Sequence, residues 1–136
     1  MDNNPMELFC AYDHLLNEVR ALFSITSEEG ESLCQVGIMD NLVEKPAMYP
    51  CIVVEMDGSR LAAYGGGSQY TGEHEFSLWV LCQWQGSFRT ARIEMAGIVD
   101  KLLSISRFYT GDAVEYGVDT VHGTRCIVAR IPGKVA

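Results

Sequence analysis

An alternating run at residues 73–85 constrains the fold of this chain more than any other feature. A strand of this length, at about 3.3 Å per residue, is long enough to cross a whole domain. The run therefore predicts a long strand, and with it a β-sheet as the framework of the fold. One face of the strand carries His74, Phe76, Leu78, Val80, Cys82 and Trp84, and the other carries Glu75, Ser77, Trp79, Leu81 and Gln83.

A second strand is predicted at residues 50–58, where a proline is followed by a β-branched run that ends at an Asp-Gly pair. Such a run is typical of a strand buried on both faces. Residues 58–72 contain Gly65, Gly66 and Gly67 and lack any periodicity. They predict a long loop, and loops of this length in compact domains are usually functional or disordered.

The C-terminal part of the chain predicts a hairpin. Residues 113–121 and 124–131 have extended character and flank His122-Gly123, a pair compatible with a tight turn. The Pro-Gly pair at residues 132–133 is expected to close the last strand.

Two segments, residues 5–24 and 88–104, have the three-and-four spacing of amphipathic helices. Pro5 suits a first helical turn, and Gly86-Ser87 is expected to end the long strand and cap the second helix. The expected buried positions are Phe9, Tyr12, Leu15, Leu16, Val19, Leu22 and Phe23 in the first helix, and Phe88, Ala91, Met95, Ile98, Val99, Leu102 and Leu103 in the second.

The chain of 136 residues has the size of one ordinary domain, so residues 1–136 are expected to form a single domain. The acidic stretch that leads to Pro46 is expected to be an exposed connection with room for one short strand. Together these elements predict a two-layer α+β fold, with two helices on one face of a mixed or antiparallel sheet of about four to five strands.

The composition excludes several classes of function. A net charge of −8 disfavours a protein that binds nucleic acid by neutralising phosphates. The N-terminus lacks the basic and apolar regions of a signal peptide, and no apolar run is long enough to span a membrane. Five scattered cysteines without a Cys-x-x-Cys pair are interpreted as reduced thiols in a cytosolic protein.

The charge is uneven along the chain. Residues 1–59 contain eleven acidic and two basic side chains, a net charge of −9, whereas residues 60–136 contain seven acidic and eight basic side chains, a net charge of +1. Solubility alone accounts for this asymmetry. The alternative interpretation is that an acidic surface of one subunit meets a less acidic surface of the next, head to tail.

No motif predicts a catalytic residue, a cofactor or a metal ion. The three glycines at 65–67 lack the Gly-Lys-Ser/Thr sequence and the helix start of a phosphate-binding loop. Cys10 and His14 lie one helical turn apart but have no second pair at matching spacing. The segment 73–75 (EHE) is interpreted as a solvated strand end, and no signature of a nucleophilic Ser or Cys is present.

Aromatic side chains supply the candidate partner contacts. Trp79 and Trp84 lie on opposite faces of the long strand, so at most one can lie under the helices, and an uncovered Trp would suit a partner. The bases of the second helix region, interpreted as a solvated face rather than a binding patch, are Arg89, Arg92, Lys101 and Arg107. The candidate interface residues are Arg60, Tyr64, Tyr70 and Trp79.

The order and character of the elements resemble small tail-completion proteins of long-tailed bacteriophages and prophages, of the Mu-like or lambda-type tail terminator kind. The resemblance rests on the N-terminal amphipathic helix, residues 49–60 (YPCIVVEMDGSR), the glycine-containing loop, residues 73–81 (EHEFSLWVL) and residues 91–103 (ARIEMAGIVDKLL). It extends from about residue 6 to residue 131, while the acidic stretch 28–31 and the five cysteines depart from the family pattern.

The resemblance implies a non-enzymatic virion component that assembles in the host cytoplasm and resides in the tail. Such a protein forms a homo-oligomer, typically a hexameric ring, that caps the tail tube protein and meets the head-tail connector protein. Two alternatives stay open: a small-ligand-binding or enzymatic α+β domain, and a phage-derived secretion-system assembly adaptor.

Overall fold

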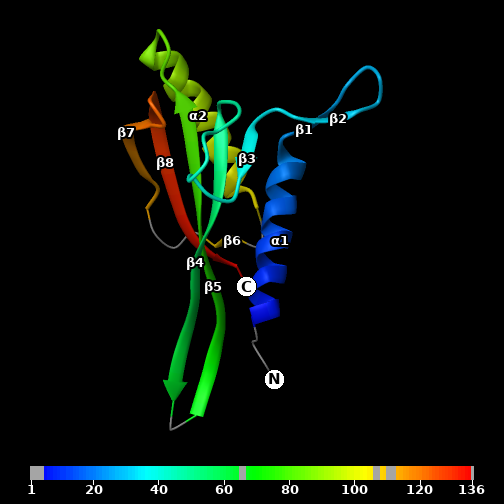
Figure 1. Cartoon of the computed structure of the whole chain (residues 1–136), viewed down its shortest axis with the longest axis vertical. Coiled ribbons are helices and arrows are strands. Elements are labelled where there is room, and N and C mark those ends of the chain that lie inside the picture. The colour runs from blue at the N-terminus through cyan, green and yellow to red at the C-terminus, as the bar shows by residue number, and fades with distance from the viewer. Residues whose placement is uncertain (1–4, 65–66, 106–107, 110–112, 136) are drawn as a thin grey trace.

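The computed structural model describes residues 5–64, 67–105, 108–109 and 113–135 (Figure 1). For residues 5–8, 32, 57–64, 67–73 and 109 it describes the backbone alone. The elements are, in chain order, α1 Pro5–Leu22, β1 Ser24–Thr26, β2 Ser32–Cys34, β3 Gly37–Met39, β4 Cys51–Tyr64, β5 Gly67–Gln83, α2 Phe88–Leu103, β6 Phe108–Tyr109, β7 Glu115–Val121 and β8 Thr124–Val135.

The predicted alternating run forms the C-terminal part of β5, which lies at the centre of a mixed sheet. The strand order is β3-β4-β5-β8-β6, with β7 also paired to β8. The β3–β4 pair is parallel and all others are antiparallel. Since β5 is flanked by β4 and β8, its backbone donors and acceptors from His74 to Leu81 have neighbours on both sides.

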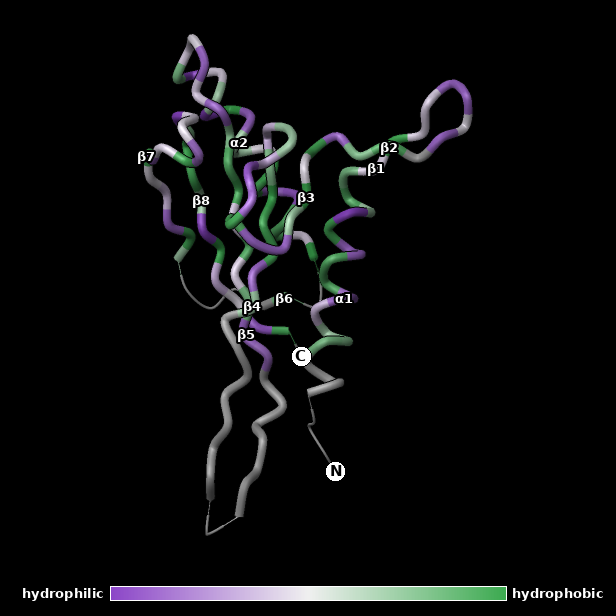
Figure 2. The backbone as a smooth tube through the Cα atoms, viewed as in Figure 1, coloured by the Kyte–Doolittle hydropathy of each residue, from purple (hydrophilic) through white to green (hydrophobic). Residues whose placement is uncertain are grey.

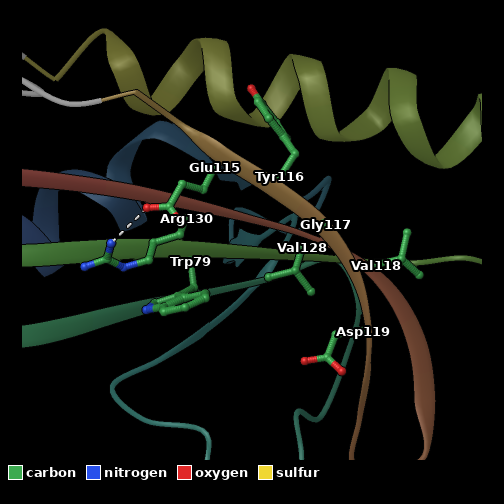
Figure 3. Close-up of a pocket in the computed structure, with 8 residues that line it drawn as sticks. All are labelled: Trp79, Glu115, Tyr116, Gly117, Val118, Asp119, Val128 and Arg130. Atoms are coloured by element: carbon green, nitrogen blue, oxygen red, sulfur yellow. Dashed lines mark hydrogen bonds and ion pairs between the residues drawn. The ribbon is translucent and has the colours of Figure 1, made fainter.

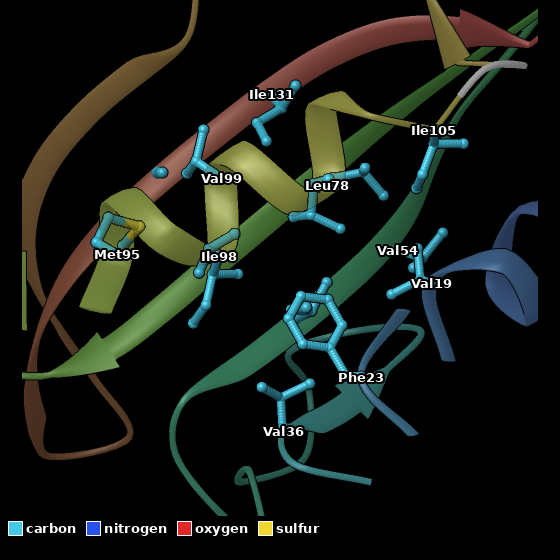
Figure 4. Packing of buried hydrophobic residues seen from close by; sticks show 14 of the residues in the cluster. Val19, Phe23, Val36, Val54, Leu78, Met95, Ile98, Val99, Ile105 and Ile131 are labelled. Atoms are coloured by element: carbon cyan, nitrogen blue, oxygen red, sulfur yellow. The ribbon is translucent and has the colours of Figure 1, made fainter. Parts of the chain in front are cut away.

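Both helices pack on one face of this sheet, which confirms the predicted α+β arrangement (Figures 1 and 4). Alternate residues of the central strands point toward the helices, as the period of two requires. This core contains Leu15, Val19 and Phe23 from α1, Ala91, Met95, Ile98, Val99 and Leu102 from α2, and Ile52, Val54, Phe76, Leu78, Val80, Cys82, Ile127, Ala129 and Ile131 from the sheet.

Three expected core residues are exposed instead. Phe9 lies in the second turn of α1, before that helix reaches the sheet core, and is 48% exposed. Phe88 is in the first turn of α2 and packs on Trp84. Leu103 ends the same helix and points away from the core formed by its neighbour Leu102.

The second face of the sheet is also covered. Cys51, Val53, Leu81 and Cys126 are fully buried there, so residues 51–54 of the predicted run 50–58 are buried on both faces, whereas Glu55 and Met56 of the same run are exposed. The segment between β3 and β4 supplies the cover through Leu42 and Tyr49. A hydrogen bond of 2.7 Å between a ring nitrogen of His122 and the carbonyl of Leu42 ties this segment to the β7–β8 turn.

The predicted loop at residues 58–72 is wrong, because β4 and β5 continue through it as a hairpin. Its backbone pairs include Leu61 with Tyr70 and Tyr64 with Gly67. The register shifts between Met56 and Gly58 and again between Ser59 and Leu61. These register shifts break the alternation on which strand prediction depends. Residues 65 and 66 of the predicted glycine loop lie outside the described residues.

Two further strand ends differ from the expectation. Strand β8 continues past the Pro-Gly pair to Val135, and Pro132 lies in the gap between the partners of β7 and β6. His74 is buried rather than solvated, since β5 still pairs with β8 at the level of Val135.

The local signals at the ends of elements are confirmed. Gly86 has a φ of +78°, and the Ser87 hydroxyl oxygen accepts a hydrogen bond from the Thr90 amide and caps α2. His122 and Gly123 both have positive φ, 48° and 79°, as a two-residue hairpin turn requires.

The predicted connection after α1 contains three short strands. β1 and β2 form a separate two-stranded ribbon, with Ile25 directly opposite Leu33. Figures 1 and 2 show this ribbon leaving the molecule on the side of α1, while β7 lies at the opposite edge of the sheet.

Candidate interaction surfaces

Trp79, a predicted interface residue, lies on the sheet face opposite the helices. Its ring is partly covered by the second core cluster, and its Nε1 donates a 3.1 Å hydrogen bond to a carboxylate oxygen of Glu55. The guanidinium of Arg130 lies 5.7 Å from the ring centroid. These contacts fix the orientation of the indole, so that one part of the ring remains available at the surface.

An open pocket of about 260 Å³ lies beside Trp79 under β7 (Figure 3). Arg130 forms a 3.4 Å ion pair there with Glu115. Asp119, which lies on β7 like Glu115, accepts a hydrogen bond from the Thr120 amide. Glu115 and Asp119 are both exposed, and both are engaged in local contacts.

The other three predicted interface residues, Arg60, Tyr64 and Tyr70, lie on the extended part of the β4–β5 hairpin. Their side chains are outside the part of the chain that the structure describes. Tyr70 precedes Trp79 on β5, and this separation corresponds to about 30 Å along an extended strand. The four residues therefore do not form one site.

An apolar groove lies between α2 and β7, at a place that the sequence does not predict. The groove has a volume of about 400 Å³. Phe88, Tyr116 and Val118 each expose two fifths or more of their side-chain surface at this place. The signal for this groove in the sequence is the alternation of Tyr116 and Val118 with polar residues in β7. This alternation does not show which face of β7 is covered by the rest of the fold. The groove is lined by Phe88, Arg92, Met95, Ala96, Tyr116, Gly117, Val118 and Ile127.

One end of this groove carries an aromatic and basic cluster. The rings of Trp84 and Phe88 lie with centroids 4.8 Å apart. Arg125 stacks 4.5 Å from the centroid of Trp84, and Arg92 lies 5.7 Å from that of Phe88. Both guanidinium groups are exposed and, among the described residues, neither forms an ion pair. They are free to meet an acidic partner.

The remaining predicted bases behave differently. Lys101 lies 5.2 Å from the ring centroid of Phe23 and covers the edge of the core. Arg107 lies outside the described residues. The basic surface is therefore concentrated at the N-terminal end of α2.

The buried thiols are poor candidates for nucleophiles. Burial raises the pKa of Cys51 to about 11. Burial, reinforced by the neighbouring Glu94 carboxylate, raises the pKa of Cys82 to about 12. Burial also raises the pKa of Cys126. A thiol in this state carries almost no thiolate at neutral pH, so it lacks the reactive form.

Among the described residues, no group of three or more His, Cys, Asp and Glu side chains is placed to hold a metal ion. Cys10 and His14 are exposed on α1. Neither α1 nor α2, the helices of the described chain, combines the length and apolar character needed to cross a bilayer.

No protein-family model matches this sequence, and no curated protein shows significant similarity to it.

Proposed function

We propose that this chain is a structural subunit of the tail of a long-tailed phage or prophage. In this role it forms a ring, with six subunits as the expected number, that caps the tail tube and joins it to the head connector. The proposal starts from the resemblance of residues 49–60, 73–81 and 91–103 to tail terminators. It is a proposal of binding and assembly and not of catalysis.

The observation that carries the proposal is the extended end of the β4–β5 hairpin. We call this part, residues 57–64 and 67–73, the arm. Figure 1 shows the arm projecting from the body of the molecule, away from the ribbon and from α2. Within the described chain, β3 pairs only with Cys51–Val53 of β4, and β8 pairs with β5 only from His74 onward.

Beyond these points the arm has no further strand on its outer edges among the described residues. Unpaired strand edges are templates for strand addition by another chain. A subunit with such an arm can pair with a neighbouring copy or with the tube protein. A ring built in this way ends tube growth when its outer surface cannot accept another tube ring.

The charge distribution is consistent with a ring around a DNA path. The net charge of −9 over residues 1–59 would repel phosphate where these residues face the lumen. DNA would then slide through the ring without binding to it.

The direct test is tube length. If a tail-tube gene lies beside the gene for this chain, its product is assembled with and without the purified chain, and tube lengths are measured by electron microscopy. Capped tubes of limited length are expected with the chain present, and unchanged lengths would contradict the proposal. Neighbouring secretion-system genes, instead of tail-tube, sheath or tape-measure genes, would favour the assembly adaptor.

A further inference from the structure

The ribbon formed by β1 and β2 is an unpartnered surface with a defined chemistry. A two-stranded ribbon outside a larger sheet is marginally stable in water unless something packs on it. Ile25 and Leu33, opposite each other on the two strands, are 44% and 45% exposed. The turn between them carries three exposed carboxylates, which we call the tip glutamates: Glu28, Glu29 and Glu31.

The groove between α2 and β7 has the complementary chemistry. Its walls are apolar, and its end carries the stacked aromatic rings with their exposed guanidinium groups. Arg89 adds a third exposed base in the first turn of α2. We call Arg89, Arg92 and Arg125 the rim arginines. An acidic, apolar ribbon and a basic, apolar groove are matched in both charge and polarity.

The two surfaces lie on opposite sides of the molecule, as Figure 1 shows for β1–β2 and β7. They therefore cannot meet within one chain without a large movement. They can meet between two copies, each giving its ribbon to the next. Such a heterologous contact joins two different surfaces, so it can repeat from one copy to the next. The series of copies closes into a ring when the rotation between neighbouring copies permits it.

We infer that the β1–β2 ribbon of one copy docks in the α2–β7 groove of a second copy of this chain. Ile25 and Leu33 pack against the apolar wall formed with Tyr116 and Val118, and the tip glutamates meet the rim arginines. This inference rests on the proposed function, because it identifies the contact between neighbouring subunits of the proposed ring. The surfaces that carry it are independent of the arm.

The test is a charge swap followed by sedimentation velocity over a wide range of protein concentration. The ribbon-reversed chain has its three tip glutamates changed to Lys, and the groove-reversed chain has its three rim arginines changed to Glu. Each chain alone is expected to associate at least about tenfold more weakly than the wild type, because like charges then face each other across the contact.

Mixing the two reversed chains is the decisive step. The Lys ribbon then faces the Glu groove, and the Glu ribbon faces the Arg groove, so association is expected to return with equal amounts of both chains. A chain damaged in folding would not regain association on mixing. A control with the same charge change at exposed acids outside the ribbon and the groove should associate as the wild type does: Asp13, Asp40 and Glu44 changed to Lys.

Three results would overturn the ribbon–groove contact: a wild-type chain that is monomeric at every concentration, reversed chains that associate like the wild type, or a mixture that stays monomeric. If the groove binds a small apolar ligand instead of a second copy, the reversed chains are expected to associate like the wild type. None of these depends on tube length, so tubes that are still capped would leave the proposed function standing without this contact.

Discussion

Gly133 lies where β8 passes the ring of Phe108. A Cβ atom added at Gly133 would lie 2.4 Å from Cζ of that ring, closer than real contacts allow. Phe108 is itself buried in the main core, so the ring has little room to move. Gly133 is therefore required by close packing near the C-terminal end of β8.

Gly133→Ala is expected to lower the free energy of unfolding by about 1–3 kcal/mol, the usual cost of overpacking. Gly97→Ala is the matched control, because a Cβ there meets nothing within 4 Å and α2 gains a better helix former. Urea denaturation of both variants measures the difference. If Phe108→Leu restores much of the loss in the Gly133 variant, the clash is the cause; equal stability of the two glycine variants would contradict it.

The buried thiols are expected to make the folded chain less stable at alkaline pH. Since the pKa values of Cys51 and Cys82 are raised from 9.0 to about 11 and about 12, their contribution to stability is complete below pH 9. It is lost as the pH rises through 9 to 12, because the unfolded chain loses these protons first. We expect the free energy of unfolding to fall by up to about 1.4 kcal/mol per pH unit for each thiol in this range.

Denaturation under reducing conditions at about pH 8 and about pH 10.5 measures this slope. Cys82→Ala should make the slope shallower, because it removes one of the buried thiols. If the free energy of unfolding of the wild type is the same at both pH values, the thiols do not control alkaline stability.

At the scale of elements, the arm is separable from the body of the fold. The core residues of β4 lie at 51–54, and those of β5 begin at His74 and Phe76, outside the arm. Joining Ser59 directly to Thr71, without residues 60–70, should therefore leave the thermal midpoint nearly unchanged. The same deletion should weaken tube capping; unchanged tube lengths would remove the arm from the proposed function.

The sequence predicts those elements whose side chains repeat without interruption. β5 and α2 are such elements, because Phe76, Leu78 and Val80 alternate and Ala91, Met95 and Ile98 recur with the helical period. The arm escapes prediction because the register shifts near Gly58 interrupt the alternating pattern. β1, β2 and β3 are three residues each, too short to show a period.

The candidate surfaces were harder to predict than the fold. The sequence predicts that Trp79 and Trp84 lie on opposite faces of the long strand, and the structure places Trp79 on the face away from the helices. The pairing of Phe88 with Tyr116 across one groove depends on how α2 lies over β7. No local pattern encodes that arrangement, because it is set by the packing of the whole core.

At the scale of the whole molecule, the ribbon–groove contact predicts sensitivity to salt. Exposed charges more than a Debye length apart are screened, and this length falls from about 10 Å at 0.1 M salt to about 3 Å at 1 M. Association of the wild-type chain should weaken as NaCl is raised. Sedimentation at low and high salt measures this, and association that strengthens with salt would point to an apolar contact without the charge pairing.

The central position of β5, with strands on both sides and cover on both faces, determines which amide protons are best shielded from deuterium. Amides between Phe76 and Leu81 can open to solvent only when neighbouring strands and both covering layers separate. Their exchange should thus report the stability of the entire molecule, while the amides of β1 and β7 exchange through small local fluctuations.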